Sequence, residues 1–263
     1  MKIYQVDAFT RRRFHGNPAA VIPVETFPED GTLLAIAGEN NLSETAFFTR
    51  RTSGEADFHL RWFTPAAEVD LCGHATLAAS HVLWTELGFE RDRIVFDTRS
   101  GHLTVTRDGG RYSMDFPAAG GEPEEASTTV IRALGRQPAE VIRGMDLLCV
   151  FENKRDVHEI EPDLALLSAI ETRGVIVTAP GAKHDFVSRF FAPSLGVAED
   201  SVTGSAHCML VPYWAKRIGR AELTAHQVSK RGGELWCKDI PGAGRVEIAG
   251  HAVTYLRGDI QIG

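Results

Sequence analysis

Two short loops in this 263-residue chain place glycine and small polar residues at the predicted start of an apolar helix. The loops are Cys72-Gly-His-Ala-Thr76 and Asp200-Ser-Val-Thr-Gly-Ser205. The first turn of a helix carries unpaired N–H groups at the positive end of the helix dipole, and it can therefore bind an anion. Together the loops predict stabilisation of a carboxylate substrate, or of a carbanion or enolate formed from it. The alternative is that Ser, Thr and Asp only cap their helices.

Four polar side chains are candidates for moving a proton. Glu44 precedes an apolar strand, where partial burial would raise its pKa and suit it to acid–base catalysis near neutral pH. His74 has an ordinary pKa of about 6.5 and can relay a proton. Asp200 can orient a neighbouring group, and Ser205 lacks His and Asp partners in the sequence, which favours a hydrogen-bonding or relay hydroxyl over a nucleophile. The structural alternatives are an exposed Glu44, a His74 that only satisfies the helix start, and a capping Asp200.

The same loops supply the candidate substrate-binding positions, together with an asparagine near the N-terminus. Asn17, which precedes Pro18, either binds substrate or only shapes a turn. The full set of predicted substrate-binding residues is Asn17, Cys72, Gly73, Ala75, Thr203 and Gly204.

An internal repeat surrounds the two loops. The segments Gly73–Gly88 and Gly204–Gly219 have equal length, and each predicts a buried helix closed by a left-handed glycine. Upstream, Arg61-Trp-Phe-Thr-Pro65 resembles Arg189-Phe-Phe-Ala-Pro193, and downstream Arg99-Ser-Gly-His-Leu103 resembles Arg231-Gly-Gly-Glu-Leu235. Landmarks in the same order predict two copies of one unit. Pro212 should kink the second helix unless it lies near the first turns.

Short β-branched or aromatic runs flank both helices, and turn clusters separate them. These runs are Ile3–Phe9, Thr45–Thr49, Ile94–Thr98, Leu103–Thr106, Gly174–Thr178 and Val246–Ile248. Further helices are predicted within Glu122–Gly135 and Pro162–Ile170. We expect an α+β fold of two pseudo-symmetric halves, 1–117 and 118–263, each with a mixed or antiparallel sheet wrapped round a central helix. The active site is expected in the cleft between the halves.

Composition excludes several classes of protein. A hydrophobic content of 43% and a net charge of −7 are typical of a soluble globular protein and argue against nucleic-acid binding. No apolar run is long enough to span a membrane, and the N-terminus does not resemble a signal peptide, so we expect a cytoplasmic protein. The four cysteines form no CxxC pair, which argues against a zinc knuckle and predicts free thiols.

The motifs resemble those of the PhzF-like phenazine-biosynthesis family along nearly the whole chain. They are Val6–Phe9 with Gly16–Pro18, Asn41–Phe47, Cys72–Thr76, Glu199–His207 and Ser229–Glu234. The resemblance implies a diaminopimelate-epimerase-like fold and an isomerase without metal or cofactor. The best-understood member isomerises trans-2,3-dihydro-3-hydroxyanthranilate, a small carboxylate. The resemblance further implies that Glu44 is the acid/base and that His74, Asp200 and Ser205 support proton movement.

Two alternatives remain from the sequence. Related epimerases use two opposed cysteines, but here Cys72 is matched by Ser201, so a two-thiol racemase is disfavoured and a one-thiol epimerase using Cys72 stays open. A non-catalytic protein that captures a small acid is the second alternative. No GxGxxG follows a strand, which argues against a nicotinamide enzyme. An exposed strand edge could pair two chains into a homodimer.

Overall fold

The computed structural model describes residues 1–262 and divides into two compact units. Unit 1 comprises Met1–Asp115 together with the residues from Ala249 onwards, and unit 2 comprises Phe116–Ile248. The change from unit 1 to unit 2 lies within two residues of the division at 117/118 drawn from the sequence. The C-terminal segment differs from that division, because it belongs to unit 1.

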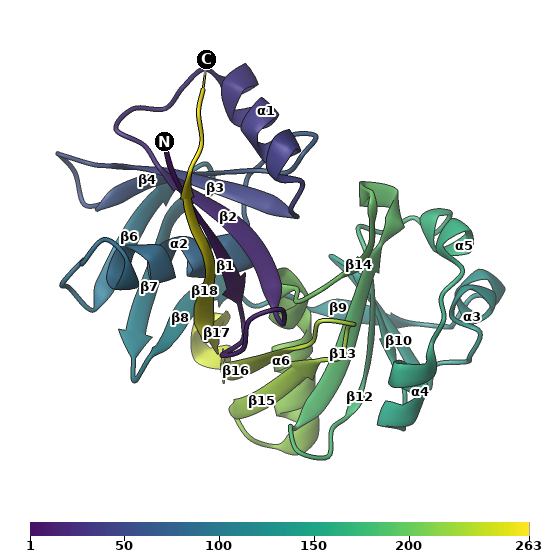
Figure 1. Ribbon diagram of the computed structural model, residues 1–263. Helices are drawn as coiled ribbons and strands as arrows, with labels where there is room; N and C mark the ends of the chain where they lie inside the picture. The colour runs from purple at the N-terminus through teal and green to yellow at the C-terminus, as the bar shows by residue number, and fades with distance from the viewer. Residues whose placement is uncertain (263) are drawn as a thin grey trace. The chain divides into compact units, whose positions relative to one another are not determined.

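Unit 1 holds a curved sheet and two helices (Figure 1). Its elements are β1 (Lys2–Ala8), β2 (Asn17–Pro23), α1 (Asp30–Asn40), β3 (Glu44–Arg50), β4 (Phe58–Phe63), β5 (Glu68–Val69), α2 (Gly73–Thr85), β6 (Arg93–Thr98), β7 (Gly101–Asp108), β8 (Arg111–Pro117) and β18 (Ala252–Asp259).

Unit 2 follows the same plan and carries three short helices, α3, α4 and α5, beside its sheet (Figure 1). Its elements are β9 (Gly121–Glu124), α3 (Thr128–Leu134), β10 (Glu140–Gly144), β11 (Leu147–Val150), α4 (Lys154–Glu159), α5 (Leu164–Ser168), β12 (Val175–Pro180), β13 (Phe186–Ala192), η1 (Pro193–Leu195), β14 (Val197–Asp200), α6 (Gly204–Ile218), β15 (Glu222–Gln227), β16 (Gly233–Ile240), η2 (Pro241–Ala243) and β17 (Arg245–Gly250).

The strand pairings of the two units match one for one. In unit 1, β1–β2 is antiparallel, β2–β3 parallel, β3–β4 and β4–β5 antiparallel, β4–β6 parallel and β6–β7 antiparallel. In unit 2 the same sequence of directions runs through β10–β11, β11–β12, β12–β13, β13–β14, β13–β15 and β15–β16. The internal repeat predicted from the sequence is therefore a repeat of topology.

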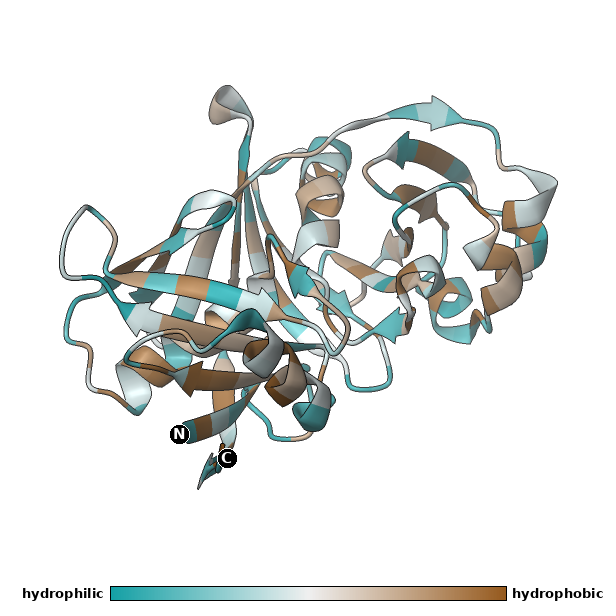
Figure 2. Cartoon of the chain, turned by 90° about the horizontal axis from the view of Figure 1, so that it is seen from above, coloured by the Kyte–Doolittle hydropathy of each residue, from teal (hydrophilic) through white to brown (hydrophobic). Residues whose placement is uncertain are grey.

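The last strand of each repeat pairs with the first strand of the other repeat. β9 follows β8 along the chain and pairs antiparallel with β10, and β18 follows β17 and pairs antiparallel with β1. This exchange places the C-terminal strand in unit 1. Along many strands apolar and polar residues alternate, as expected for sheets with one face in a core (Figure 2).

Helix α2 is buried on every side, since all residues from His74 to Trp84 are buried. It contacts β1, β2, β3 and β18. Its polar side chains are satisfied inside the unit: His81 bonds the Tyr112 hydroxyl at 2.9 Å and the Thr254 hydroxyl at 3.0 Å. The helix has no side that faces solvent, so its polar side chains cannot bond to water. The internal hydrogen bonds take the place of those bonds to water.

Helix α6 continues through Pro212, so the proline does not end the helix. Its effect is on the hydrogen bonds of the helix backbone. Proline has no N–H, so the carbonyl of Cys208 one turn earlier loses its usual helical donor. The backbone N–H of Ala119 supplies that bond at 2.9 Å. The helix is thereby tied to the segment that leads into β9.

Matched ion pairs hold the hairpin that precedes each central helix. Arg61 on β4 makes a bidentate pair with Glu68 at 2.8 and 2.7 Å, and Arg189 on β13 makes one with Glu199 at 2.7 and 3.1 Å. The arginine side chains are only 13% and 12% exposed. Bidentate geometry at low exposure makes these pairs stronger than ordinary surface pairs.

A second matched pair of contacts fixes the start of β4 and β13. The Asp57 carboxylate accepts from the backbone N–H of Val95 at 2.9 Å, and the Asp185 carboxylate accepts from that of Thr224 at 2.7 Å. Each contact joins the residue before the strand to the parallel neighbour, β6 or β15. The duplication therefore extends to side chains outside the motifs recognised in the sequence.

The sequence predictions of the fold are confirmed in outline. The α+β class with one central helix per half is as expected, and Gly88 and Gly219 have φ of 68° and 79°. The helix expected within Glu122–Gly135 is shorter, because β9 occupies its first part and Ser127 caps α3 by accepting from Val130 N–H. No helix within residues 1–262 is both long and apolar enough to span a membrane.

Replacing either buried arginine should destabilise the protein to a similar extent. Arg61→Met and Arg189→Met each leave a carboxylate without its bidentate partner, and we expect a loss of about 2–4 kcal/mol in the free energy of unfolding. Urea titration measures both. The control is Arg155→Met, whose side chain is 82% exposed and for which we expect a loss below about 0.5 kcal/mol. Equal losses for all three variants would contradict the prediction.

Candidate functional site

Three candidate residues of unit 1 meet at one end of its sheet. Asn17 begins β2 and Glu44 begins β3, and because these strands are parallel neighbours their first residues lie at the same edge. His74 is the second residue of α2. Its Nε2 lies 3.2 Å from Glu44 Oε2, with the His74 side chain 7% and the Glu44 side chain 19% exposed. The carboxylate is thus half-buried against an imidazole.

The other ring nitrogen of His74 faces the remaining unit 1 residues of the site. Its Nδ1 lies 3.3 Å from Asn17 Nδ2 and 3.5 Å from the Cys72 thiol. An amide nitrogen can only donate, so Nδ1 accepts and the ring proton is on Nε2. This tautomer places the ring proton on the nitrogen that lies 3.2 Å from the Glu44 carboxylate, a contact that does not have hydrogen-bond geometry.

Burial keeps His74 uncharged. Loss of water lowers the pKa of His74 to about 3, so the ring is neutral at physiological pH. In the contact with Glu44 the ring is therefore uncharged, and the contact is not an ion pair.

Neither central helix is capped by a side chain. The N-cap residues are Cys72 in α2 and Thr203 in α6, and neither side chain accepts a hydrogen bond from the first turn of its helix. The alternative that these polar loops serve only as caps therefore loses its main support. The first-turn N–H groups of Gly73 to Ala75 and of Gly204 to Ala206 are left to other partners.

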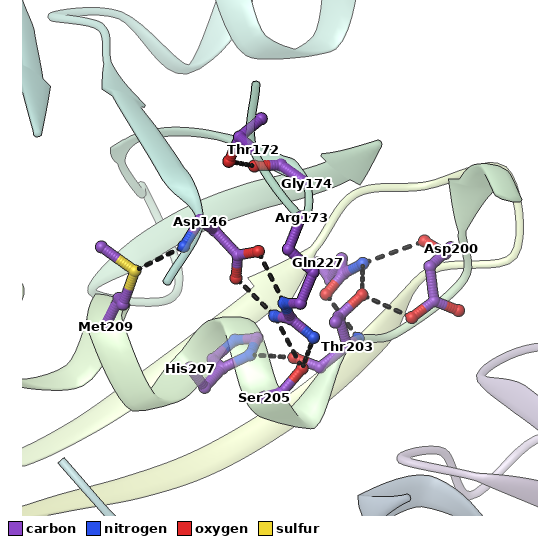
Figure 3. Close-up of polar contacts among 10 residues, drawn as sticks. All are labelled: Asp146, Thr172, Arg173, Gly174, Asp200, Thr203, Ser205, His207, Met209 and Gln227. Carbon is purple, nitrogen blue, oxygen red and sulfur yellow. Dashed lines mark hydrogen bonds and ion pairs between the residues drawn. The ribbon is translucent and has the colours of Figure 1, made fainter. Parts of the chain in front are cut away.

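In unit 2, Ser205 is held by an arginine–aspartate pair (Figure 3). Arg173 donates to Ser205 Oγ from both terminal nitrogens at 3.1 Å, and to Asp146 at 2.8 and 2.5 Å. Asp146 is fully buried, and burial raises its pKa while Arg173 acts in the opposite direction. Ser205 has no histidine partner among these contacts, in agreement with the prediction that it is not an activated nucleophile.

The remaining unit 2 candidates form a second network beside Ser205 (Figure 3). Thr203 donates its hydroxyl proton to Asp200 at 2.5 Å, and its N–H donates to Gln227 Oε1 at 2.8 Å. Gln227 Nε2 donates in turn to the Asp200 carbonyl at 2.9 Å. The loop before α6 is therefore fixed by side chains from within its own unit.

One group in the site has the donor types that bind a metal. The donor atoms of Glu44, Cys72 and His74 all lie within 4.8 Å of one another. Carboxylate, thiolate and imidazole are ligands that zinc accepts. The expectation that the protein uses no metal stays a prediction.

The structure thus brings the predicted residues together in two groups. Unit 1 holds Asn17, Glu44, Cys72, Gly73, His74 and Ala75, and unit 2 holds Asp200, Thr203, Gly204 and Ser205. Sequence reasoning missed Arg173, Asp146 and Gln227. The internal repeat gave no signal for Arg173, because the strand register aligns Arg173 with Ser43 and aligns Glu44 with Gly174.

Comparisons with known proteins agree with this architecture. Residues 6–258 match the family model described as phenazine biosynthesis-like protein, PhzC-PhzF. The chain is 51% identical over 265 residues to an uncharacterized isomerase of Pseudomonas aeruginosa, covering 100% of this chain and 99% of that one.

Solved structures show the same similarity. A crystal structure of a PhzF-family phenazine biosynthesis protein from Enterococcus faecalis is 43% identical with a TM-score of 0.95 and covers 99% of both chains. A putative PhzC/PhzF protein from Clostridium difficile is 41% identical with a TM-score of 0.93 and covers 100% of both chains. The fold is that of the diaminopimelate-epimerase-like proteins. Within that class, the chain belongs to the phenazine biosynthesis-like PhzC-PhzF family.

The buried imidazoles predict a loss of stability in mild acid. Burial lowers the pKa of His74 to about 3 and the pKa values of His81 and His207 to about 4. In the unfolded chain these rings titrate near about 6.5. Above that pH both states are neutral, whereas below it only the unfolded state binds protons, so stability falls as pH drops from about 6.5 toward 4.

Each ring contributes a slope of about 1.4 kcal/mol per pH unit in that window. Urea titrations at pH 7.5, 6.5, 5.5 and 5.0 measure the slope. His81→Gln keeps polar atoms that can bond to Tyr112 and Thr254, and it should reduce the slope by about 1.4 kcal/mol per pH unit, the contribution of one ring. Replacement of the exposed His158 by Gln should leave the slope unchanged. A stability that does not change between pH 7.5 and 5.0 would rule this out.

Proposed function

We propose that the protein is a cofactor-independent isomerase that moves a proton on a small carboxylate substrate, with Glu44 as the acid/base. The observation that carries the proposal is the half-buried Glu44 carboxylate 3.2 Å from a neutral, buried His74. A relative with 51% identity bears the name isomerase, and this supports the reaction class. Membership of the family supports it further.

The proposed mechanism gives each candidate residue a role in proton transfer. Glu44 takes a proton from a carbon atom of the substrate, and the negative charge that develops is stabilised by first-turn N–H groups of the central helices. His74 orients Glu44 through its Nε2–H. Asp200 and Ser205 assist return of the proton at a different atom. Cytoplasmic location and a homodimer stay predictions from the sequence.

A second candidate is epimerisation through Cys72. Its thiol lies 3.5 Å from His74 Nδ1 and immediately precedes α2, and a helix N-terminus favours a thiolate. The sequence matched Cys72 with Ser201, the N-cap residue of α6 is Thr203, and neither residue is a thiol. Cys72→Ser with full activity excludes this candidate.

Glu44→Gln should keep the fold and lose the reaction. The amide has the shape of the carboxylate but cannot accept the proton, so we expect turnover to drop by about two to four decades. The assay incubates the protein in D₂O with trans-2,3-dihydro-3-hydroxyanthranilate, and with carboxylates that raise the melting temperature in a screen, and follows deuterium incorporation by NMR.

The controls separate an isomerase from a binding protein. Circular dichroism and the melting temperature of Glu44→Gln should equal those of the parent protein. Binding of a carboxylate without any deuterium incorporation in the parent protein would favour capture over catalysis. Near-normal turnover by Glu44→Gln would remove its role as acid/base.

A further inference from the structure

The two units place different polar groups at neighbouring positions of the matched turn before β3 and β12. In β3–β4, Thr45 pairs with Phe63, and in β12–β13, Val175 pairs with Phe191. The repeat aligns Phe63 with Phe191, so the residues just before Thr45 align with those just before Val175. This register aligns Glu44 with Gly174, and it aligns Arg173 with Ser43, one residue earlier. Glu44 contacts His74, the second residue of α2, and Arg173 contacts Ser205, the second residue of α6.

The matched turn therefore carries a carboxylate facing an imidazole in unit 1 and, one position earlier, a guanidinium facing a hydroxyl in unit 2. The acceptor in the first pair is the strand residue, Glu44. In the second pair the strand residue, Arg173, is the donor, and the helix residue Ser205 accepts. The roles of donor and acceptor are exchanged between the repeats.

Arg173 is held rigidly in the orientation that this contact needs. Two bonds to the fully buried Asp146 fix the plane of the guanidinium, and its central carbon lies 5.5 Å from the centre of the Phe190 ring. The next residue is Gly174, where an added Cβ would lie 2.3 Å from the same ring. The loop, the ring and the aspartate together restrict Arg173 to one position.

A guanidinium has only donors, so the Ser205 oxygen must be the acceptor in both contacts. Its single proton then points away from Arg173. We propose that Arg173 is a positioning residue that commits the Ser205 hydroxyl to donate a hydrogen bond to the substrate or to the anion formed from it. This inference rests on the proposed function.

The Asp146–Arg173 pair also sets the charge of this half of the site. The buried carboxylate balances the guanidinium, so Ser205 experiences directed N–H groups with little net charge. Preorganised donors of this kind stabilise charge that develops in a transition state without attracting a charged ligand strongly beforehand. We expect Arg173 to affect kcat more than KM.

The first test needs no substrate. Ser205→Cys in a Cys72→Ala background places a thiol where the hydroxyl accepts from Arg173, and its pKa is read from absorbance at 240 nm between pH 5 and 10. The native thiols do not interfere, because burial raises the pKa values of Cys149 and Cys208 to about 12 and raises that of Cys237.

Two guanidinium donors stabilise a thiolate, so the pKa of the introduced thiol should lie below the ordinary value of about 8.5. Adding Arg173→Met should raise it by at least one unit. If Arg173→Met does not fold because Asp146 is left buried and charged, Arg173→Met with Asp146→Leu removes both charges. An unchanged pKa after loss of Arg173 would overturn the inference.

The second test asks whether Arg173 acts through Ser205. Arg173→Met should lower kcat about ten- to a hundredfold in the parent protein with little change in KM, and should lower it no further in a Ser205→Ala background. Arg136→Met is the matched control: its guanidinium bonds two carboxylates, and its side chain is 38% exposed, compared with 34% for Arg173. It should keep the parent kcat.

Additive losses from Arg173→Met and Ser205→Ala would overturn the inference. Failure of the proposed function gives a different pattern. If Glu44→Gln retains turnover, the role of Glu44 is lost, while the titration of the introduced thiol still decides whether Arg173 holds Ser205 as a donor.

Discussion

The buried start of helix α2 is the constraint on which the unit 1 group depends. The helix is enclosed on all sides, so the ring nitrogens of His74 have Asn17, Cys72 and Glu44 as their neighbours in place of water. Enclosure also keeps the ring neutral. A charged imidazolium would form an ion pair with Glu44, whereas the neutral ring does not.

Sequence patterns predicted what local spacing encodes. The helices at Gly73 and Gly204, their closing glycines and the strands at Thr45–Thr49 and Ile94–Thr98 follow from apolar runs bounded by turn residues, and the repeat gave the two-part α+β fold. Glu44, His74 and Asn17 were named by chemistry and by family resemblance. That all three meet depends on β2 and β3 being parallel neighbours, a long-range pairing that local spacing does not specify.

Other features had no local signal. Arg173 and Asp146 are 27 residues apart, and neither lies in a recognised motif, so their bidentate contact appears only when β11 and β12 pair. The helix predicted within Glu122–Gly135 is α3, whereas strand β9 at the start of that segment is short and polar and had no apolar alternation to reveal it. Pro212 was expected to kink α6. The Cys208 carbonyl, which has no helical donor because of Pro212, accepts instead from the backbone N–H of Ala119, about ninety residues earlier in the chain.

The exchange of β9 and β18 gives the chain the connectivity of a covalently joined dimer. In a single repeat the first strand would have an unpaired edge. In this chain the first strand of each repeat, β1 or β10, pairs at that edge with the last strand of the other repeat, β18 or β9. The fold is therefore what fusion of two copies of an ancestral, strand-trading subunit would produce. Met1 and Ile260 are joined by backbone hydrogen bonds, so the ends of the present chain lie together. Linking them and opening the chain between β9 and β10 would give a circular permutant in which the order of the two repeats is reversed.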